Sequence, residues 1–421
     1  AGTQMTINGV VSGTGSIAKD GTGTLILSGS NTYTGDTTIS AGTISVQEDN
    51  GLGADSVGTV AIAGNTLDFN GDVTVAAKAN TTINDGTITN TAGTNSYATN
   101  IAVTNTANVN TTTSTQLTLG GVISGGALAK AGAGTLVLSG ANTYTGNTAI
   151  NAGTVRVEDN NGLGADSTGT VSLAAGTTLE LNGNLTVAAK TGATMATGST
   201  IQNTAGDTTT WSTNTAITGT GNLNVAGTQL TMGGVVSGSG GIAKAGTGTL
   251  LLNSANSYTG TTAISSGSIK FGVDNAIKSG NSVSIATGSN LDLNGNSATL
   301  AVTGGTTLAG SGSTLLNGSN TGTVQASSAS VNGTTLTGVL NTSGTSTLTN
   351  VLGTSEFNLN SGTTTLVGQS NFGDVNLIGG TLAVNVPTDG STPLTSTGTV
   401  NSTNGVVALN ATPLTQAQLR G

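Results

Sequence analysis

Short runs of alternating apolar and small polar residues fill most of this chain. The segments GTLILSG (23–29) and TTISAGTISV (37–46) are typical examples. Runs of four to seven such residues, separated by Gly, Asn and Ser, are characteristic of β-strands joined by tight turns. No stretch sustains an apolar period of 3.6 residues, so we expect very little helix. The pattern therefore predicts an all-β chain built from many short strands.

The same segments recur along the chain. The stretch LSGSNTYTGDTTISAGTISV (27–46) returns with small changes at 138–157 and again at 252–271. The first two copies also share a GLGADS segment and a TVAAK segment. Self-similarity at a fixed period is the signature of a repeat architecture. The organisation that follows is a β-solenoid over 1–302, with repeat units at about 8–118, 119–231 and 232–302, and more divergent β-solenoid coils over 303–421.

The side chains available for a core decide between β architectures. A sandwich core normally holds large aromatic residues, whereas this chain has four Phe, four Tyr and one Trp. Leu, Ile, Val and Ala suit the narrow interior of a parallel β-solenoid, and Thr, Ser and Asn on successive rungs form hydroxyl and amide ladders. At roughly 20–22 residues per coil, we predict a parallel β-helix of about 20 coils, about five in each repeat.

Composition excludes several kinds of function. Charged residues make up 6% of the chain, the net charge is −9 and no basic patch exists, which argues against nucleic acid and anionic lipid as partners. Without Cys or His there is no disulfide, no thiolate or imidazole metal site and no Ser-His-Asp triad. The chain contains no apolar run of about 20 residues, so the sequence predicts no membrane-spanning helix. The sequence starts at Ala1 without a signal peptide, so we expect a mature form or an excised segment.

One stretch carries a family resemblance. The segment GGVISGGALAKAGAGTLVLSGANTYTGNTAINAGTVRV (120–157), with its counterparts at 9–46 and 233–271, closely resembles the passenger-associated transport repeat. The pattern G-x-L-x-K-x-G-x-G-T-L-x-L-x-x-x-N-x-Y-x-G carries this match. The repeat occurs in the passenger domains of bacterial autotransporters, which use type V secretion. The resemblance implies a right-handed β-helix at the surface of a Gram-negative bacterium, often an adhesin, and it does not extend beyond about residue 303.

Two residue types stand at matching places in all three copies. Tyr33, Tyr144 and Tyr258 are expected to pack against neighbouring coils or to form an amphipathic ring on the rod, and a ligand-contact surface is the alternative. A catalytic lysine would need a depressed pKa and a partner group. We instead expect the repeated lysines to be snorkelling or corner lysines whose stems cover the start of a strand and which help to prevent edge aggregation. These lysines are Lys19, Lys130 and Lys244.

Acidic residues gather after each repeat motif. We expect a solvated surface loop, with a weak calcium site and acid–base catalysis on polysaccharide as alternatives. Two near-identical clusters would make two active sites, which is unusual for an enzyme. We therefore predict no catalytic, cofactor-binding or metal-binding residue and no cofactor. The acidic residues are Glu48, Asp49 and Asp55, then Glu158, Asp159 and Asp166, with Asp274 in the third copy.

The sequence thus predicts a non-enzymatic structural or adhesive rod, a passenger segment of an autotransporter-like protein. It would lie outside the cell or at the outer-membrane surface of a Gram-negative bacterium. The alternative is a self-assembling subunit of an extracellular filament or surface layer, stacking end to end through open rungs. Expected partners are a host or neighbouring-cell surface, or copies of the chain itself in a homo-oligomer or fibre.

Overall fold

A computed structural model gives the fold of residues 3–204, 206–298, 306–309, 314–320, 323–385, 394–396 and 400–410. These residues fall into two compact units that divide between Gly221 and Asn222. Both units are stacks of short strands paired in parallel, with about 17 turns in all. The described residues contain no helix at all, and hence none with the length and apolarity to cross a bilayer.

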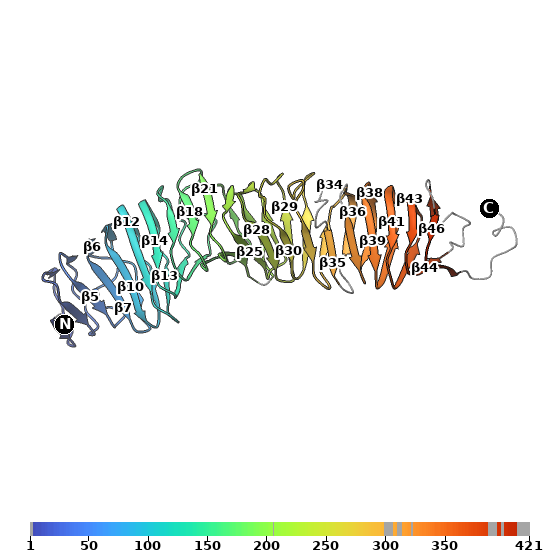
Figure 1. Ribbon diagram of the computed structural model, residues 1–421. Coiled ribbons are helices and arrows are strands. Elements are labelled where there is room, and N and C mark those ends of the chain that lie inside the picture. Colours follow the sequence, from blue (N-terminus) through green and yellow to red (C-terminus); the bar gives the residue numbers. More distant parts are fainter. Residues whose placement is uncertain are drawn as a thin grey trace. The chain divides into compact units, whose positions relative to one another are not determined.

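Three parallel ladders build the first unit, and Figure 1 shows its strands stacked coil upon coil in blue and green. The first ladder contains β1 (Gln4–Ile7), β3 (Thr24–Leu27), β5 (Thr43–Val46), β7 (Thr66–Asn70), β10 (Thr87–Ala92), the ends of β12 (Ile101–Thr111) and β14 (Ile123–Ala131), then β16 (Thr148–Ile150), β18 (Thr170–Leu173), β21 (Gly192–Met195) and β24 (Thr215–Ile217). The second contains β2 (Ile17–Lys19), β4 (Thr37–Ile39), β6 (Thr59–Ala63), β9 (Asn80–Asn84) and the first residues of β12 and β14. The third contains β8 (Thr74–Val75), β11 (Thr94–Tyr97), β13 (Gln116–Leu119), β15 (Thr135–Leu138), β17 (Thr154–Val157), β19 (Thr178–Leu181) and β22 (Thr200–Asn203). A further pair is β20 (Thr186–Val187) with β23 (Thr208–Trp211).

The second unit continues the same construction with two long ladders. One contains β28 (Gly241–Ala245), β30 (Thr262–Ile264), β32 (Val283–Ile285), β35 (Thr306–Ala309), β37 (Val324–Ser327), β39 (Val339–Ser343), β41 (Thr354–Leu359) and β43 (Ser370–Leu377), which pairs with both β45 (Leu394–Ser396) and β46 (Val400–Ser402). The other contains β26 (Gln229–Met232), β29 (Thr249–Leu252), β31 (Ser268–Phe271), β33 (Asn290–Asp292), β36 (Thr314–Asn320), β38 (Ser330–Leu336), β40 (Thr345–Thr349), β42 (Thr363–Val367), β44 (Gly380–Asn385) and β47 (Gly405–Asn410). The remaining strands are β25 (Thr220–Val225), β27 (Val236–Ser237) and β34 (Ser297–Ala298), which pairs with β36.

The alternation in the sequence explains the core. In the first ladder Leu25 stacks on Ile44, and Ile44 stacks on Leu67, with all three side chains buried. Burying a side chain of this size contributes about 1.5–3 kcal/mol relative to leaving it in water. Since each coil touches only its neighbours, this stabilisation accumulates along the stack rather than in one centre.

The repeat does not correspond to a whole number of coils. Starting at Lys19, the second ladder passes through five successive rung partners and arrives at Gly125. Lys130 lies five residues further along the chain, where it stacks on Val109 in the first ladder. The second copy of the motif is therefore displaced by one face of the coil relative to the first. The repeat therefore spans five coils and one further face.

The expected all-β parallel solenoid is confirmed, and its coils vary in length. Ile44 and Leu67 are rung partners 23 residues apart, whereas Leu340 and Phe357 are only 17 apart. The right-handed coil stays a prediction. So do the boundaries of the repeat units in 1–302 and the uninterrupted coils over 303–421. The end of the chain, PLTQAQLRG, lies outside the described residues.

Candidate functional site

The repeated lysine is buried and its ammonium group is surrounded by backbone carbonyls. Lys130 Nζ donates to Ala131 O at 2.7 Å, Gly132 O at 2.7 Å and Ala152 O at 3.1 Å. Two of these carbonyls belong to the corner of its own coil and the third to the corner of the next. All three ammonium donors are therefore used, and the lysine joins two coils. Lys19 and Lys244 make the matching bonds, to Asp20, Gly21 and Ala41 and to Ala245, Gly246 and Ser266.

Burial sets the electrostatics of these lysines. The side chains of Lys130 and Lys244 are 0% exposed, and desolvation lowers the pKa of each to about 8. No carboxylate is among the hydrogen-bond acceptors. The expectation of a corner position is correct, but a snorkelling lysine is wrong, because the ammonium group is turned inward onto carbonyls. A depressed pKa without a partner group or open access does not make a nucleophile.

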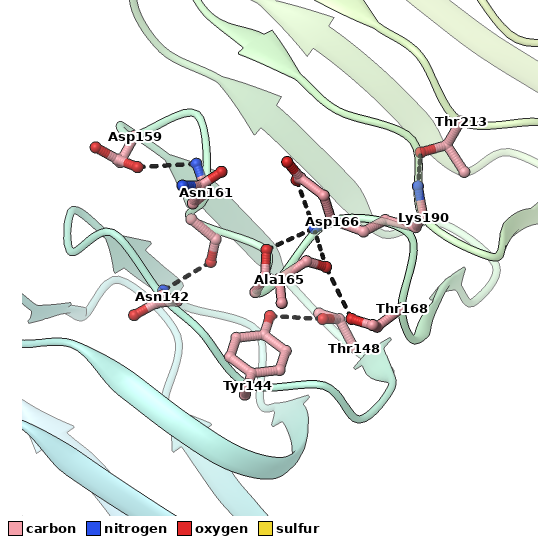
Figure 2. Close-up of polar contacts among 12 residues, drawn as sticks. Asn142, Tyr144, Thr148, Asp159, Asn161, Ala165, Asp166, Thr168, Lys190 and Thr213 are labelled. Carbon is pink, nitrogen blue, oxygen red and sulfur yellow. Dashed lines mark hydrogen bonds and ion pairs between the residues drawn. The ribbon is translucent and has the colours of Figure 1, made fainter.

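The repeated tyrosine is also buried and hydrogen-bonded. The hydroxyls of Tyr144 and Thr148 are hydrogen-bonded at 2.6 Å. Figure 2 marks this contact with a dashed line, and Tyr33 and Tyr258 contact the hydroxyls of Thr37 and Thr262 in the same way. Burial raises the pKa of Tyr33 to about 12 and raises the pKa of the other two as well. The tyrosines thus pack against neighbouring coils. A ligand-contact surface and an external ring are both wrong.

The asparagine two residues before the repeated tyrosine bridges three coils. The Val236 amide donates to Asn256 Oδ1 at 2.7 Å, while Asn256 Nδ2 donates to Ala276 O at 2.6 Å. Asn31 and Asn142 do the same in the other copies. The asparagine recurs two residues before each repeated tyrosine, and this recurrence is the signal in the sequence that marks it.

A second lysine locks the loop that follows each of the first two motifs. Lys190 Nζ donates to Gly164 O at 2.6 Å and to Ala165 O at 3.0 Å, and it lies 3.9 Å from Asp166 Oδ1. Figure 2 shows Lys190 together with Ala165 and Asp166. Burial lowers the pKa of Lys190, and the Asp166 carboxylate opposes that shift. Lys78 bonds Gly53 O and Ala54 O in the first copy. Sequence reasoning assigned no role to these two lysines, although the repeated TVAAK segments contain them.

The loop between motif and lysine is docked on the tyrosine. Leu163 is buried, and Gly164 has a left-handed backbone with φ of +85°. A Cβ at Gly164 would lie 2.4 Å from Tyr144 O and 2.9 Å from the ring. Only glycine fits there, which explains the repeated GLG sequence.

Most acidic side chains accept hydrogen bonds within this framework. Glu158 accepts from Asn182 Nδ2 at 3.0 Å and Asp159 accepts from the Asn161 amide at 2.8 Å. At one corner position the acceptor is Asp in two copies and Asn in the other, so its role needs an oxygen and no negative charge. Its acceptor–donor pairs are Asp49 with the Thr74 amide at 2.7 Å, Asn160 with Thr186 at 2.8 Å and Asp274 with Ser297 at 2.8 Å.

The remaining predicted acids do not assemble a metal site. Asp55 is exposed, and Glu48 Oε1 accepts from Ser30 Oγ at 3.2 Å. Within the residues that the structure describes, no group of three or more His, Cys, Asp or Glu side chains could hold a metal ion. The geometry favours the solvated-loop interpretation for the tips of these loops, while their bases are held by the framework.

Comparison with known proteins identifies the framework. The family model of the passenger-associated transport repeat matches residues 17–46, 128–157 and 242–270, which contain the lysine, the asparagine and the tyrosine of each copy. This chain carries autotransporter passenger repeats. Its passenger β-helix is 34% identical over 155 residues to the adhesin BmaC autotransporter of Brucella suis biovar 1 (strain 1330). That alignment covers 36% of this chain and 4% of the relative, so the chain spans a small part of the length of the protein it matches. No solved structure matches the chain.

Proposed function

We propose that this passenger β-helix is a non-enzymatic segment of a surface-exposed or secreted bacterial protein, acting as a rigid adhesive or spacing element. One observation carries the proposal. In all three repeats the lysine and the asparagine hold coil to coil by hydrogen bonds, and the buried tyrosine bonds to a threonine of its own coil and packs against the next coil. The shared residues of the repeat thus stabilise the solenoid, and the outward side chains of the strands are the ones that contact a partner.

Relatedness to a protein named as an adhesin supports a host or neighbouring-cell surface as partner. The acceptor roles of the acids support the absence of catalysis, because Asp and Asn exchange at one corner without loss of the hydrogen bond. A Gram-negative cell surface is the location that the passenger repeats favour.

Adhesion of coated beads tests the proposal. Beads bearing the folded chain are expected to be retained on epithelial or bacterial cell layers more than beads bearing the heat-unfolded chain. Retention that is equal for both, together with turnover of acidic polysaccharide that is lost in the E158A/D159A double variant, would replace adhesion by catalysis. Light scattering over a concentration series examines the alternative of end-to-end assembly, which predicts a mass that grows with concentration.

A further inference from the structure

Five of the nine basic residues of this chain are buried lysines. Lys19, Lys78, Lys130, Lys190 and Lys244 are each no more than 8% exposed, and their ammonium groups bond to backbone carbonyls. Most acidic residues, by contrast, lie at exposed corners and loop tips. The folded surface therefore offers very few lysine side chains to a protein or reagent that recognises lysine.

Two half-buried basic residues lie in the middle of ladders. Arg156 is in β17, which pairs on both sides, and its Nε lies 3.3 Å from Glu180 Oε2. Lys270 is in β31, which also pairs on both sides, and its rung partner is Asp292. A protease must take several residues in extended form into its cleft, so cleavage here would first require strands to leave the ladder on both sides.

Among the basic residues that the structure describes, Lys278 alone is both half-buried rather than buried and outside the strands. It lies in the turn between β31 and β32, where its carbonyl accepts the Asn281 amide at 3.1 Å, and it is followed by the exposed residues Ser279 and Gly280. Gly280 has φ of +86° and open space around a Cβ position. Buried Ile277 anchors one side of this turn, and Asn281 Nδ2 anchors the other through Tyr258 O at 2.8 Å.

This turn stands where the third copy departs from the other two. In the first two copies the equivalent region is the GLGADS loop, closed over the tyrosine by a glycine and held by Lys78 or Lys190. The third copy has VDNAIKSGN over 273–281 instead and places a lysine at the turn itself.

We propose that a lysine- or arginine-specific protease makes its first cut in the folded chain at the Lys278–Ser279 bond. Burial of the five other lysines in the framework keeps the protease from cutting after them. Water adds across this amide, giving a carboxylate at Lys278 and a new amine at Ser279. The two pieces stay joined in the nicked protein, because Ile264 pairs with Ile285 and Lys270 pairs with Asp292 across the cut.

Limited digestion with trypsin tests the proposal, with intact mass and N-terminal sequencing of the products. The expected result is one early cut after Lys278, with both fragments eluting together in size exclusion and separating only in denaturant. The K278Q variant should lower the rate of the first cut by about tenfold or more, since cleavage elsewhere requires ladder opening. The matched K270Q variant should be cut at the wild-type rate.

The unfolded chain is the internal standard, because trypsin should then cut at all its lysines. Loss of the single residue after Arg420, which lies outside the described residues, is distinguished by mass. Early cuts after Lys130 or Lys244 in the folded chain would show that burial does not protect these lysines. An unchanged rate of the first cut in K278Q, or no cut after Lys278, would show that Lys278–Ser279 is not the first bond cut.

Discussion

At the scale of single residues, each repeated lysine donates three hydrogen bonds to backbone carbonyls and so joins two coils. Sequence patterns located Lys19, Lys130 and Lys244 correctly but placed their ammonium groups in solvent. Strand alternation does put the lysine on the inner face, since Leu128 and Lys130 are both buried in β14. The acceptors could not be predicted, because one of them comes from a corner about 20 residues later in the chain.

Replacing the buried lysine should weaken the coil contact. K130M removes three hydrogen bonds and leaves the carbonyls of Ala131, Gly132 and Ala152 without that donor. At about 1 kcal/mol for each, we expect the free energy of unfolding to fall by roughly 3 kcal/mol. Urea denaturation followed by Trp211 fluorescence measures the loss. Q47M, at an exposed position of the same unit, is the control and should change stability by less than about 0.5 kcal/mol.

The buried lysines and tyrosines predict opposite effects of alkaline pH. The folded pKa of Lys130 is about 8, below the ordinary 10.5, so the unfolded state holds more protons from about pH 8 and stability rises with pH there. The folded pKa of Tyr33 is about 12, above the ordinary 10, so the folded state holds more protons above pH 10 and stability falls. Denaturation midpoints between pH 7 and 11.5 should therefore pass through a maximum near pH 10. A steady decline from pH 7, or a rise that persists unchanged in K130M/K244M, would contradict this assignment.

At the scale of elements, the GLGADS loop shows which structural features the sequence predicts and which it does not. Repetition of GLGADS marked the loop, and its acids suggested a solvated segment. The sequence did not predict that this loop contacts the tyrosine, because Gly164 and Tyr144 come close only once the coil has folded. Likewise, the Thr-Leu alternation predicted strands such as β15, but periodicity within one strand carries no information on which strand it pairs with.

A pair of glycine substitutions examines this docking. G164A is expected to cost about 3 kcal/mol or more, since its Cβ would meet Tyr144 O at 2.4 Å in addition to the strain of a positive φ. Gly176 is the matched control, with φ of +72° and open space, so G176A should cost only about 1 kcal/mol. Thermal denaturation of both variants gives the comparison, and equal losses would show that the loop does not rest on the tyrosine.

At the scale of the whole molecule, the chain divides into two units with separate reporters. The single tryptophan, Trp211, is fully buried in the first unit, whereas far-UV circular dichroism reports on the strands of both. Stability in a solenoid is a sum of coil and neighbour contributions, so damage in one unit need not spread through the other.

A lysine substitution in the second unit tests this independence. K244M should lower the midpoint of part of the dichroism transition, because it breaks the bonds from Lys244 to Ala245, Gly246 and Ser266. The midpoint of Trp211 fluorescence should stay within experimental error. Equal shifts in both signals would mean that the chain unfolds as one cooperative block.

The displacement of the second motif by one face has a consequence for how such chains grow over evolutionary time. A duplicated gene segment does not need to encode a whole number of coils, because a three-faced coil accepts an insertion that ends on any face. The buried Lys130 takes a place in the first ladder that an aliphatic residue holds in neighbouring coils, and the hydrophobic seam continues through Val109 and Ile150. Recombination can thus lengthen or shorten the protein in steps of a third of a coil, and each inherited motif then points in a new direction around the axis.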